Sequence, residues 1–228
     1  MDSKRLAAIA IIAALEVVFD SIVTPTFTEG VWYGLIFVIS PLAGIVLGPR
    51  DGFISTLTAV LVGHTISPRG IYEYLFTLGA PICSLITGYT YRGRIKPALI
   101  LYTLMFGAYF ATPVSWSLPL WGVWDTLLAY LVTILLAFRS SKFLDKKRLT
   151  IGLSALIGLE ADVLFRIFLF IPCQTYRIIY GFTPEVLYVI WAFSAPIITP
   201  LKVAVSVAIT AFSAPTILKV IGELSDRA

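Results

Sequence analysis

Seven ionisable side chains interrupt the hydrophobic segments of this sequence and could take part in chemistry there. They are Asp20, His64, Glu73, Asp125, Asp162, Arg166 and Lys202. Ionisable groups inside a membrane are costly, and they usually line a cavity or pair with one another. All seven fall toward the outer end of their segments, by the orientation that the basic residues give below. They therefore predict a pocket for a small ligand, open to the outside.

The signs of these charges and the aromatic residues at the same depth bear on the ligand. Mixed signs favour a zwitterionic or otherwise polar organic ligand over a bare metal ion. Trp32, Trp121 and Trp191 are candidate stacking walls, although Trp and Tyr also form belts at membrane surfaces. Asp162 and Arg166 are four residues apart, so an ion pair within one helix is the alternative to ligand contact.

The first hydrophobic segment, LAAIAIIAALEVVFDSIV, has two contrasting faces. Ala7, Ala10 and Ala14 form a stripe of small side chains on a helix, and Glu16 and Asp20 lie roughly opposite. Small side chains let helices approach closely, so the stripe is a candidate partner interface or a packing face within the chain. Asp20 lies at the depth of the pocket. Glu16 is deeper, and we expect it to hold the bundle together.

The composition is that of an integral membrane protein. The chain has 228 residues, 58% hydrophobic and 13% charged, with a mean hydropathy of +0.92. Soluble domains are typically about 45–50% apolar and about 25% charged. We predict an all-α, polytopic transmembrane helical bundle that forms a single domain over residues 1–228. The net charge of +4 is dispersed at segment ends, so no nucleic acid partner is expected.

About eight segments are long or apolar enough to span a membrane, which takes roughly 20 residues. Pro196 and Pro200 predict a break in the last one, with a short helix before it. The segments are Leu6–Val23, Val31–Gly48, Gly52–Ile66, Ile71–Tyr91, Pro97–Thr112, Leu120–Phe138, Leu149–Ile171 and Glu185–Ile221.

Basic residues orient these segments, because cytoplasmic loops carry an excess of Lys and Arg. With the N-terminus inside, only Arg69 and Arg177 fall in outer loops. The inner set is Lys4, Arg5, Arg50, Arg92, Arg94, Lys96, Arg139, Lys142, Lys146, Lys147, Arg148, Lys219 and Arg227. This bias predicts an even number of spans in the cell membrane with both termini cytoplasmic. Six spans satisfy it as well as eight if one hairpin is re-entrant.

The sequence lacks the common motifs of ATP hydrolysis and of metal- or serine-dependent hydrolysis. There is no Walker A motif, no His-Glu-x-x-His and no Gly-x-Ser-x-Gly, so we expect neither ATP hydrolysis nor a cofactor in this chain. Two rival functions stay open. An intramembrane enzyme acting on a lipid or isoprenoid would use Glu160, Asp162 and Arg166. An autonomous channel or small-solute transporter would place charge through the full depth.

The run from Pro41 to Tyr91 carries a family resemblance. A segment ending in Leu-Gly-Pro is followed by a tight turn through Gly48, Pro49 and Gly52 and then by the next segment. From Gly70 to Tyr91, aromatic residues lead into a further helix. That helix contains small residues and Gly88 and is followed by basic residues. This pattern resembles the substrate-binding S component of energy-coupling factor (ECF) transporters, most closely over residues 1–95.

The resemblance implies a fold and partners. It implies a six-helix core completed by residues 149–222, with residues 97–138 as an additional hairpin. It implies an Ala-x-x-x-Ala contact, here Ala10 and Ala14, with a membrane-embedded T component, and two cytosolic ATPases that use ATP. The ligand would be a vitamin-like or other small polar micronutrient, bound without chemistry. Members that bind anionic vitamins have a basic residue beside a proline at the start of the last helix, and Pro200 with Lys202 resembles that pattern.

Overall fold

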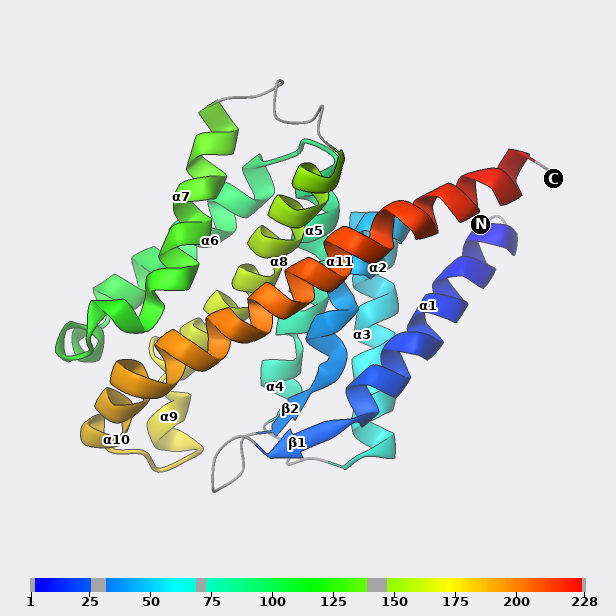
Figure 1. The fold of residues 1–228 in the computed structure, drawn as a ribbon. Coiled ribbons are helices and arrows are strands. Elements are labelled where there is room, and N and C mark those ends of the chain that lie inside the picture. The colour runs from blue at the N-terminus through cyan, green and yellow to red at the C-terminus, as the bar shows by residue number, and fades with distance from the viewer. Residues whose placement is uncertain (1–2, 26–31, 69–72, 139–146, 227–228) are drawn as a thin grey trace.

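The computed structural model describes residues 3–25, 32–68, 73–138 and 147–226 (Figure 1). These residues are almost entirely helical, so the predicted all-α class is confirmed. The exception is a two-stranded antiparallel ribbon in which β1 (Val23–Pro25) pairs with β2 (Trp32–Gly34). The ribbon extends the chain beyond the end of the first helix.

The first half of the chain packs as a layer of helices beside the centre of the molecule (Figure 1). The long helix α1 lies at one edge and packs along α3. Behind α3, the helices α2 and α5 pack against each other and α5 packs on α8. The elements are α1 (Ser3–Ser21), η1 (Leu35–Val38), α2 (Ser40–Leu47), α3 (Pro49–Ile66), α4 (Glu73–Thr77) and α5 (Gly79–Tyr91).

The turn between α2 and α3 lies at the predicted Leu-Gly-Pro sequence. Gly48 has φ +97°, a value that side chains rarely adopt, and Pro49 opens α3, where its missing N–H is tolerated. Two predicted spans are interrupted. The segment Val31–Gly48 contains β2, η1 and a helix of only eight residues, and Ile71–Tyr91 is divided at Leu78 into α4 and α5.

The second half surrounds α8, which contacts α5, α6, α7 and α11. The pair α6–α7 packs on the side of α8 away from α1, and α11 crosses the bundle diagonally (Figure 1). The elements are α6 (Lys96–Ala111), η2 (Pro113–Ser117), η3 (Leu120–Val123), α7 (Trp124–Phe138), α8 (Lys147–Phe170), α9 (Thr175–Ile178), α10 (Pro184–Val189), η4 (Ile190–Ser194) and α11 (Ala195–Asp226).

The predicted break at Pro196 and Pro200 is wrong, because α10, the π-helical turn η4 and α11 follow one another without a gap. Each proline lacks the N–H that would bond the carbonyl four residues earlier, which leaves Ala192 O and Pro196 O without that donor. Two indoles supply donors instead. Trp121 Nε1 lies 3.3 Å from Ala192 O, and Trp124 Nε1 lies 3.0 Å from Pro196 O.

Two of the described helical stretches, Leu120–Phe138 and Pro184–Val220, are long and apolar enough to cross a membrane. Large apolar side chains also point outward from them. Among these are Leu128, Leu131, Leu135, Phe138, Ile197, Leu201, Val205 and Phe212. In addition, α1 begins and α11 ends at the same end of the molecule (Figure 1).

Candidate functional site

A cavity of about 190 Å³ lies between η1, α4, α8, the start of α7 and the η4–α11 helix. An engineered cavity of about 150 Å³ is enough to hold benzene, so this one has room for a small organic molecule. Its charged lining residues are Asp20, Glu73, Asp125, Asp162, Arg166 and Lys202. Its aromatic lining residues are Phe37, Phe76, Phe170, Tyr180, Phe182 and Trp191.

The structure brings together most of the residues that the sequence singled out. Six of the seven ionisable residues and Trp191 line the cavity. His64 lies behind the lining, bonded to Asp20. Trp121 is outside the cavity and donates to a backbone carbonyl of η4, and the side chain of Trp32 is outside the described part of the chain. Ligand contact by any of them stays a prediction.

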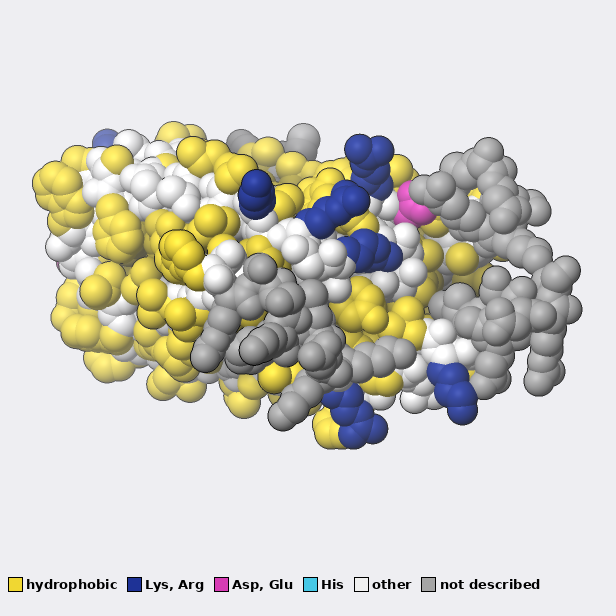
Figure 2. Space-filling view, turned by 90° about the horizontal axis from the view of Figure 1, so that it is seen from above, with side chains coloured by type: hydrophobic (Ala, Val, Ile, Leu, Met, Phe, Trp, Pro, Cys, Tyr) yellow, Lys and Arg dark blue, Asp and Glu magenta, His cyan; other side chains and the backbone are white. Residues whose placement is uncertain are grey.

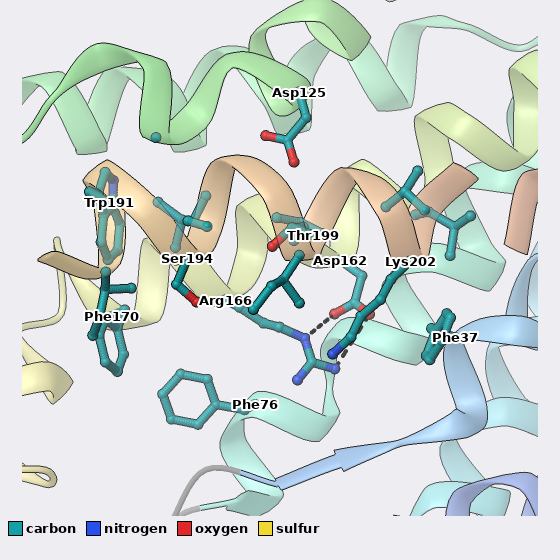
Figure 3. A pocket seen from close by; sticks show the side chains of 18 of the residues that line it. Phe37, Phe76, Asp125, Asp162, Arg166, Phe170, Trp191, Ser194, Thr199 and Lys202 are labelled. Atoms are coloured by element: carbon teal, nitrogen blue, oxygen red, sulfur yellow. Dashed lines mark hydrogen bonds and ion pairs between the residues drawn. The ribbon is translucent and has the colours of Figure 1, made fainter. Parts of the chain in front are cut away.

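One end of the cavity is ionic. Arg166 donates to both carboxylate oxygens of Asp162, at 2.7 and 3.4 Å, so the predicted pair within α8 exists and also lines the cavity. The backbone of Gly79 passes so close to Asp162 Oδ1 that any side chain there would overlap it. From α11, Lys202 extends its ammonium toward the Arg166 guanidinium (Figure 3). Three charges therefore converge on one end.

The other end of the cavity is aromatic. The rings of Phe170 and Trp191 are nearly parallel, with an interplanar angle of 13° and centroids 6.3 Å apart. Phe76 and Tyr180 lie within 6.1 Å of Phe170, centroid to centroid. Aromatic walls with a few polar groups are typical of small-molecule sites. The cavity therefore offers a flat apolar surface at one end and charges at the other.

Tyr180 connects the aromatic end to a carboxylate. Its phenol donates to Glu73 Oε1 at 3.2 Å, across 107 positions of sequence. Burial and the nearby Glu73 carboxylate raise the pKa of Tyr180 above its ordinary value, because both disfavour the phenolate. Tyr180 therefore stays protonated and keeps its donor role.

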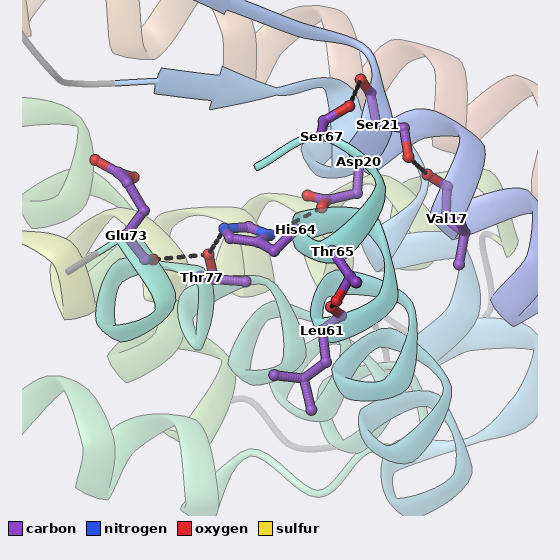
Figure 4. A network of polar contacts seen from close by, with 9 residues as sticks. All are labelled: Val17, Asp20, Ser21, Leu61, His64, Thr65, Ser67, Glu73 and Thr77. Carbon is purple, nitrogen blue, oxygen red and sulfur yellow. Dashed lines mark hydrogen bonds and ion pairs between the residues drawn. The ribbon is translucent and has the colours of Figure 1, made fainter. Parts of the chain in front are cut away.

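Behind the cavity wall runs a buried polar chain (Figure 4). His64 Nδ1 lies 3.1 Å from Asp20 Oδ2, and His64 Nε2 lies 2.6 Å from Thr77 Oγ1. The Thr77 hydroxyl also donates to Glu73 O at 2.8 Å. A carboxylate, imidazole and hydroxyl in this order resemble a nucleophile with its base. Here the hydroxyl is bonded to its own helix, so the chain fixes α1, α3 and α4 to one another.

Glu16 is buried farther along α1, outside the cavity lining. Its carboxylate accepts hydrogen bonds from Ser55 Oγ at 2.8 Å and Thr56 Oγ1 at 2.6 Å, both on α3. This is the structural role expected for Glu16. The opposite face of α1 differs, because Ala7, Ala10 and Ala14 are all exposed. Within the described part of the chain, no helix covers the alanine stripe.

Several lining residues were missed by the sequence reading. Phe170 lies four residues after Arg166 and eight after Asp162, so extending their helical face would have found it. Thr199, three residues before Lys202 on α11, could have been found in the same way. The sequence offers no such signal for Phe182, which reaches the cavity from the loop after α9.

The arrangement is suited to binding. Among the described residues, no group of three or more His, Cys, Asp or Glu side chains could hold a metal ion. Asp162 and Arg166 are bonded to each other, Asp20 to His64 and Glu73 to Tyr180. Charged and hydrogen-bonding groups of this kind suit recognition of polar ligand groups. Comparison of the chain with protein-family models, with curated proteins and with solved structures finds no match.

Proposed function

We propose that this chain is the substrate-capturing subunit of an ECF-type uptake transporter. It would bind a vitamin-like or other small polar micronutrient. The observation that supports this most is the cavity, which gathers Asp20, Glu73, Asp162, Arg166 and Lys202 from four separate elements around an aromatic end. Side chains so far apart in sequence share one concave site, as a binding protein requires.

The proposal includes a multi-pass position in the cell membrane, with about eight membrane-embedded segments and both termini cytoplasmic. Three observations support it. Two helices are long and apolar enough to span, and large apolar side chains cover their outer faces. The start of α1 and the end of α11 lie at the same end of the molecule. The face of the molecule seen from above in Figure 1 carries Lys and Arg side chains with little acidic surface among them (Figure 2).

The proposed partners are a membrane-embedded T component and two cytosolic ATPases, which would use the ATP. The support is the exposed alanine stripe at the edge of the bundle, since small side chains permit close approach of a second helix. On α1, Glu16 and Asp20 hold one face against α3, which leaves the alanine face toward the surroundings.

Copurification tests the proposal. We expect the tagged chain, co-expressed with a T component and its ATPases, to retain them through detergent extraction. Changing Ala10→Leu and Ala14→Leu together should abolish that complex, because the added side chains hold the partner helix away. The matched control is Leu15→Phe, which adds bulk to an exposed position of the same helix that lies about 100° or more around the axis from Ala10 and Ala14. A complex that survives the double change, or one that never forms, contradicts the proposal.

The enzyme alternative is weaker on geometry. Its three candidate residues were Glu160, Asp162 and Arg166, and only Asp162 and Arg166 line the cavity. These two are bonded to each other. Such an enzyme would convert a lipid or isoprenoid without any partner. Product formation by the purified chain in lipid vesicles would therefore favour it.

A further inference from the structure

One wall of the cavity is a narrow seam between two stretches of chain. Leu120–Asp125 supplies Gly122 and Asp125 to the cavity, and residues 190–200 supply Trp191, Ser194 and Thr199. The opposite side of the seam faces outward, where Trp121 is 55% exposed and Trp124 is 44% exposed. The same short stretch, Leu120–Asp125, therefore lines the cavity with some side chains and faces the surroundings with others.

The seam is closed by hydrogen bonds from indoles to backbone. Trp121 and Trp124 donate to Ala192 O and Pro196 O, whose helical donors are absent because residues 196 and 200 are prolines. A helix normally satisfies its own carbonyls, and here two of them rely on the neighbouring element. Separating the stretches would leave both carbonyls without these donors, so the two indoles act as a latch.

The same stretch is built to bend. Sharp changes of helix direction are almost always found at prolines and π-helical turns, and η4–α11 holds a π-helical turn at Ile190–Ser194 followed by Pro196 and Pro200. The closed position also depends on Gly122. A Cβ there would lie 2.6 Å from Trp191 O and 2.9 Å from Trp191 Cγ, far inside ordinary contact.

We propose that this seam is a lateral portal to the cavity, closed by the Trp121 and Trp124 indoles and opened by bending η4–α11 at its prolines. Ligand would enter or leave between η3–α7 and η4–α11. The inference rests on the cavity being the capture site of the proposed function. The hinge and the two carbonyls that the indoles bond both lie within residues 190–200, so one motion breaks both hydrogen bonds.

Alkylation of a cavity cysteine tests the portal in the purified chain. Ser194→Cys places a thiol in the cavity wall, Cys173→Ser removes the exposed native thiol, and N-ethylmaleimide is the probe. Loss of one hydrogen bond, worth about 1 kcal/mol, should raise the population of the open state about fivefold. We expect Trp124→Phe to raise the alkylation rate about fivefold, and Trp121→Phe with Trp124→Phe roughly thirtyfold.

Trp116→Phe is the matched control, because the Trp116 indole is 73% exposed and donates to Phe110 O within its own segment. Its alkylation rate should equal that of the parent. Cys83, which is fully buried, reports folding, since it reacts only if the bundle unfolds. The portal is overturned if the double Trp variant reacts at the parent rate, or if Trp116→Phe accelerates the reaction as much.

Two further variants test the hinge with both indoles in place. Gly122→Ala should force the seam apart and raise the alkylation rate. Pro200→Ala restores a donor for Pro196 O and should lower the rate below that of the parent. Unchanged rates in both variants overturn the hinge. Since alkylation needs no partner, a failed portal with an intact transporter complex would leave the proposed function standing, and the reverse result would leave the portal standing.

Discussion

Two walls of the same cavity are held in opposite ways. On the α1 side, the lining residue Asp20 bonds to the buried His64, and Glu16, buried farther along the same helix, bonds to Thr56. On the seam side, exposed indoles bond to backbone carbonyls of η4 and α11. The first wall contains polar groups that have nowhere else to bond. The second contains groups whose donors can reach the surroundings.

This difference separates a fixed wall from a movable one. A buried carboxylate that loses its partners keeps its full desolvation penalty, so the α1 wall opens only at high cost. An exposed indole that leaves a carbonyl loses one hydrogen bond and regains other contacts. The cavity therefore has a rigid side that positions Asp20 and Glu73 and a side that can open near Trp191.

The largest effect is expected from removing the buried Glu16 carboxylate, which joins α1 to α3. Glu16→Ala leaves the Ser55 and Thr56 hydroxyls without their acceptor and opens a void between α1 and α3. We expect the free energy of unfolding to fall by about 3 kcal/mol, measured by denaturant titration in detergent micelles. Leu15→Ala, at an exposed position beside it, is the control. Equal losses in both variants would mean that the α1 wall is not specially fixed.

A smaller loss of unfolding free energy is expected at Gly63, whose backbone lies against the Asp20 side chain. A Cβ at Gly63 would lie 2.9 Å from Asp20 Cβ, so Gly63→Ala should displace Asp20 from His64. Overpacking of this kind costs typically about 1–3 kcal/mol of unfolding free energy. Gly107→Ala meets nothing within 4 Å and, by its better helix propensity, should be neutral or stabilising. Thermal unfolding of both variants makes the comparison, and similar midpoints would contradict it.

Substitutions in the seam should lower the unfolding free energy less than those beside α1. Trp124→Phe keeps the ring and removes one hydrogen bond, which lowers the unfolding free energy by about 1 kcal/mol. In a Pro200→Ala background the helix has its own donor for Pro196 O, so the same change should cost less. A double-mutant cycle measures this coupling. Additive effects of Trp124→Phe and Pro200→Ala would show that the indole does not replace the missing N–H.

The smallest effect is expected at the alanine stripe. Ala10→Leu with Ala14→Leu changes exposed positions, so the unfolding free energy of the isolated chain should stay within about 0.5 kcal/mol. The same double change is expected to abolish the transporter complex. A large loss of stability in the isolated chain would mean that the stripe packs within the chain, as the rival interpretation holds.

Local sequence patterns predicted what depends on neighbours along one helix. Helical periodicity predicted the pair of Asp162 with Arg166. The clustering of ionisable residues toward one end of the segments predicted all six charged residues that line the cavity. Contacts between distant elements were beyond the sequence. Pro196 and Pro200 predicted a break because nothing nearby supplies the missing donors, and the donors come from tryptophans more than 70 positions earlier. For the same reason the sequence could not show that Trp121 donates to Ala192 O.

The length of a hydrophobic run was also a poor guide to helix boundaries. Val31–Gly48 is apolar enough for one span, yet Pro41 sets the start of α2 and leaves only eight helical residues before Gly48. Glu73 was found from its charge alone. Its partner Tyr180 could not be predicted, because the contact joins α4 to a loop 107 positions away.

The central claim is that the cavity captures a small molecule, and mass spectrometry of the purified chain tests it directly. Small molecules released from the parent protein are compared with those from the variant carrying Arg166→Gln and Lys202→Gln. Both proteins are first shown to be folded to the same extent. We expect one compound at near-equimolar amount in the parent and its loss from the variant. The same compound retained by the variant, or none in the parent grown in rich medium, would contradict it.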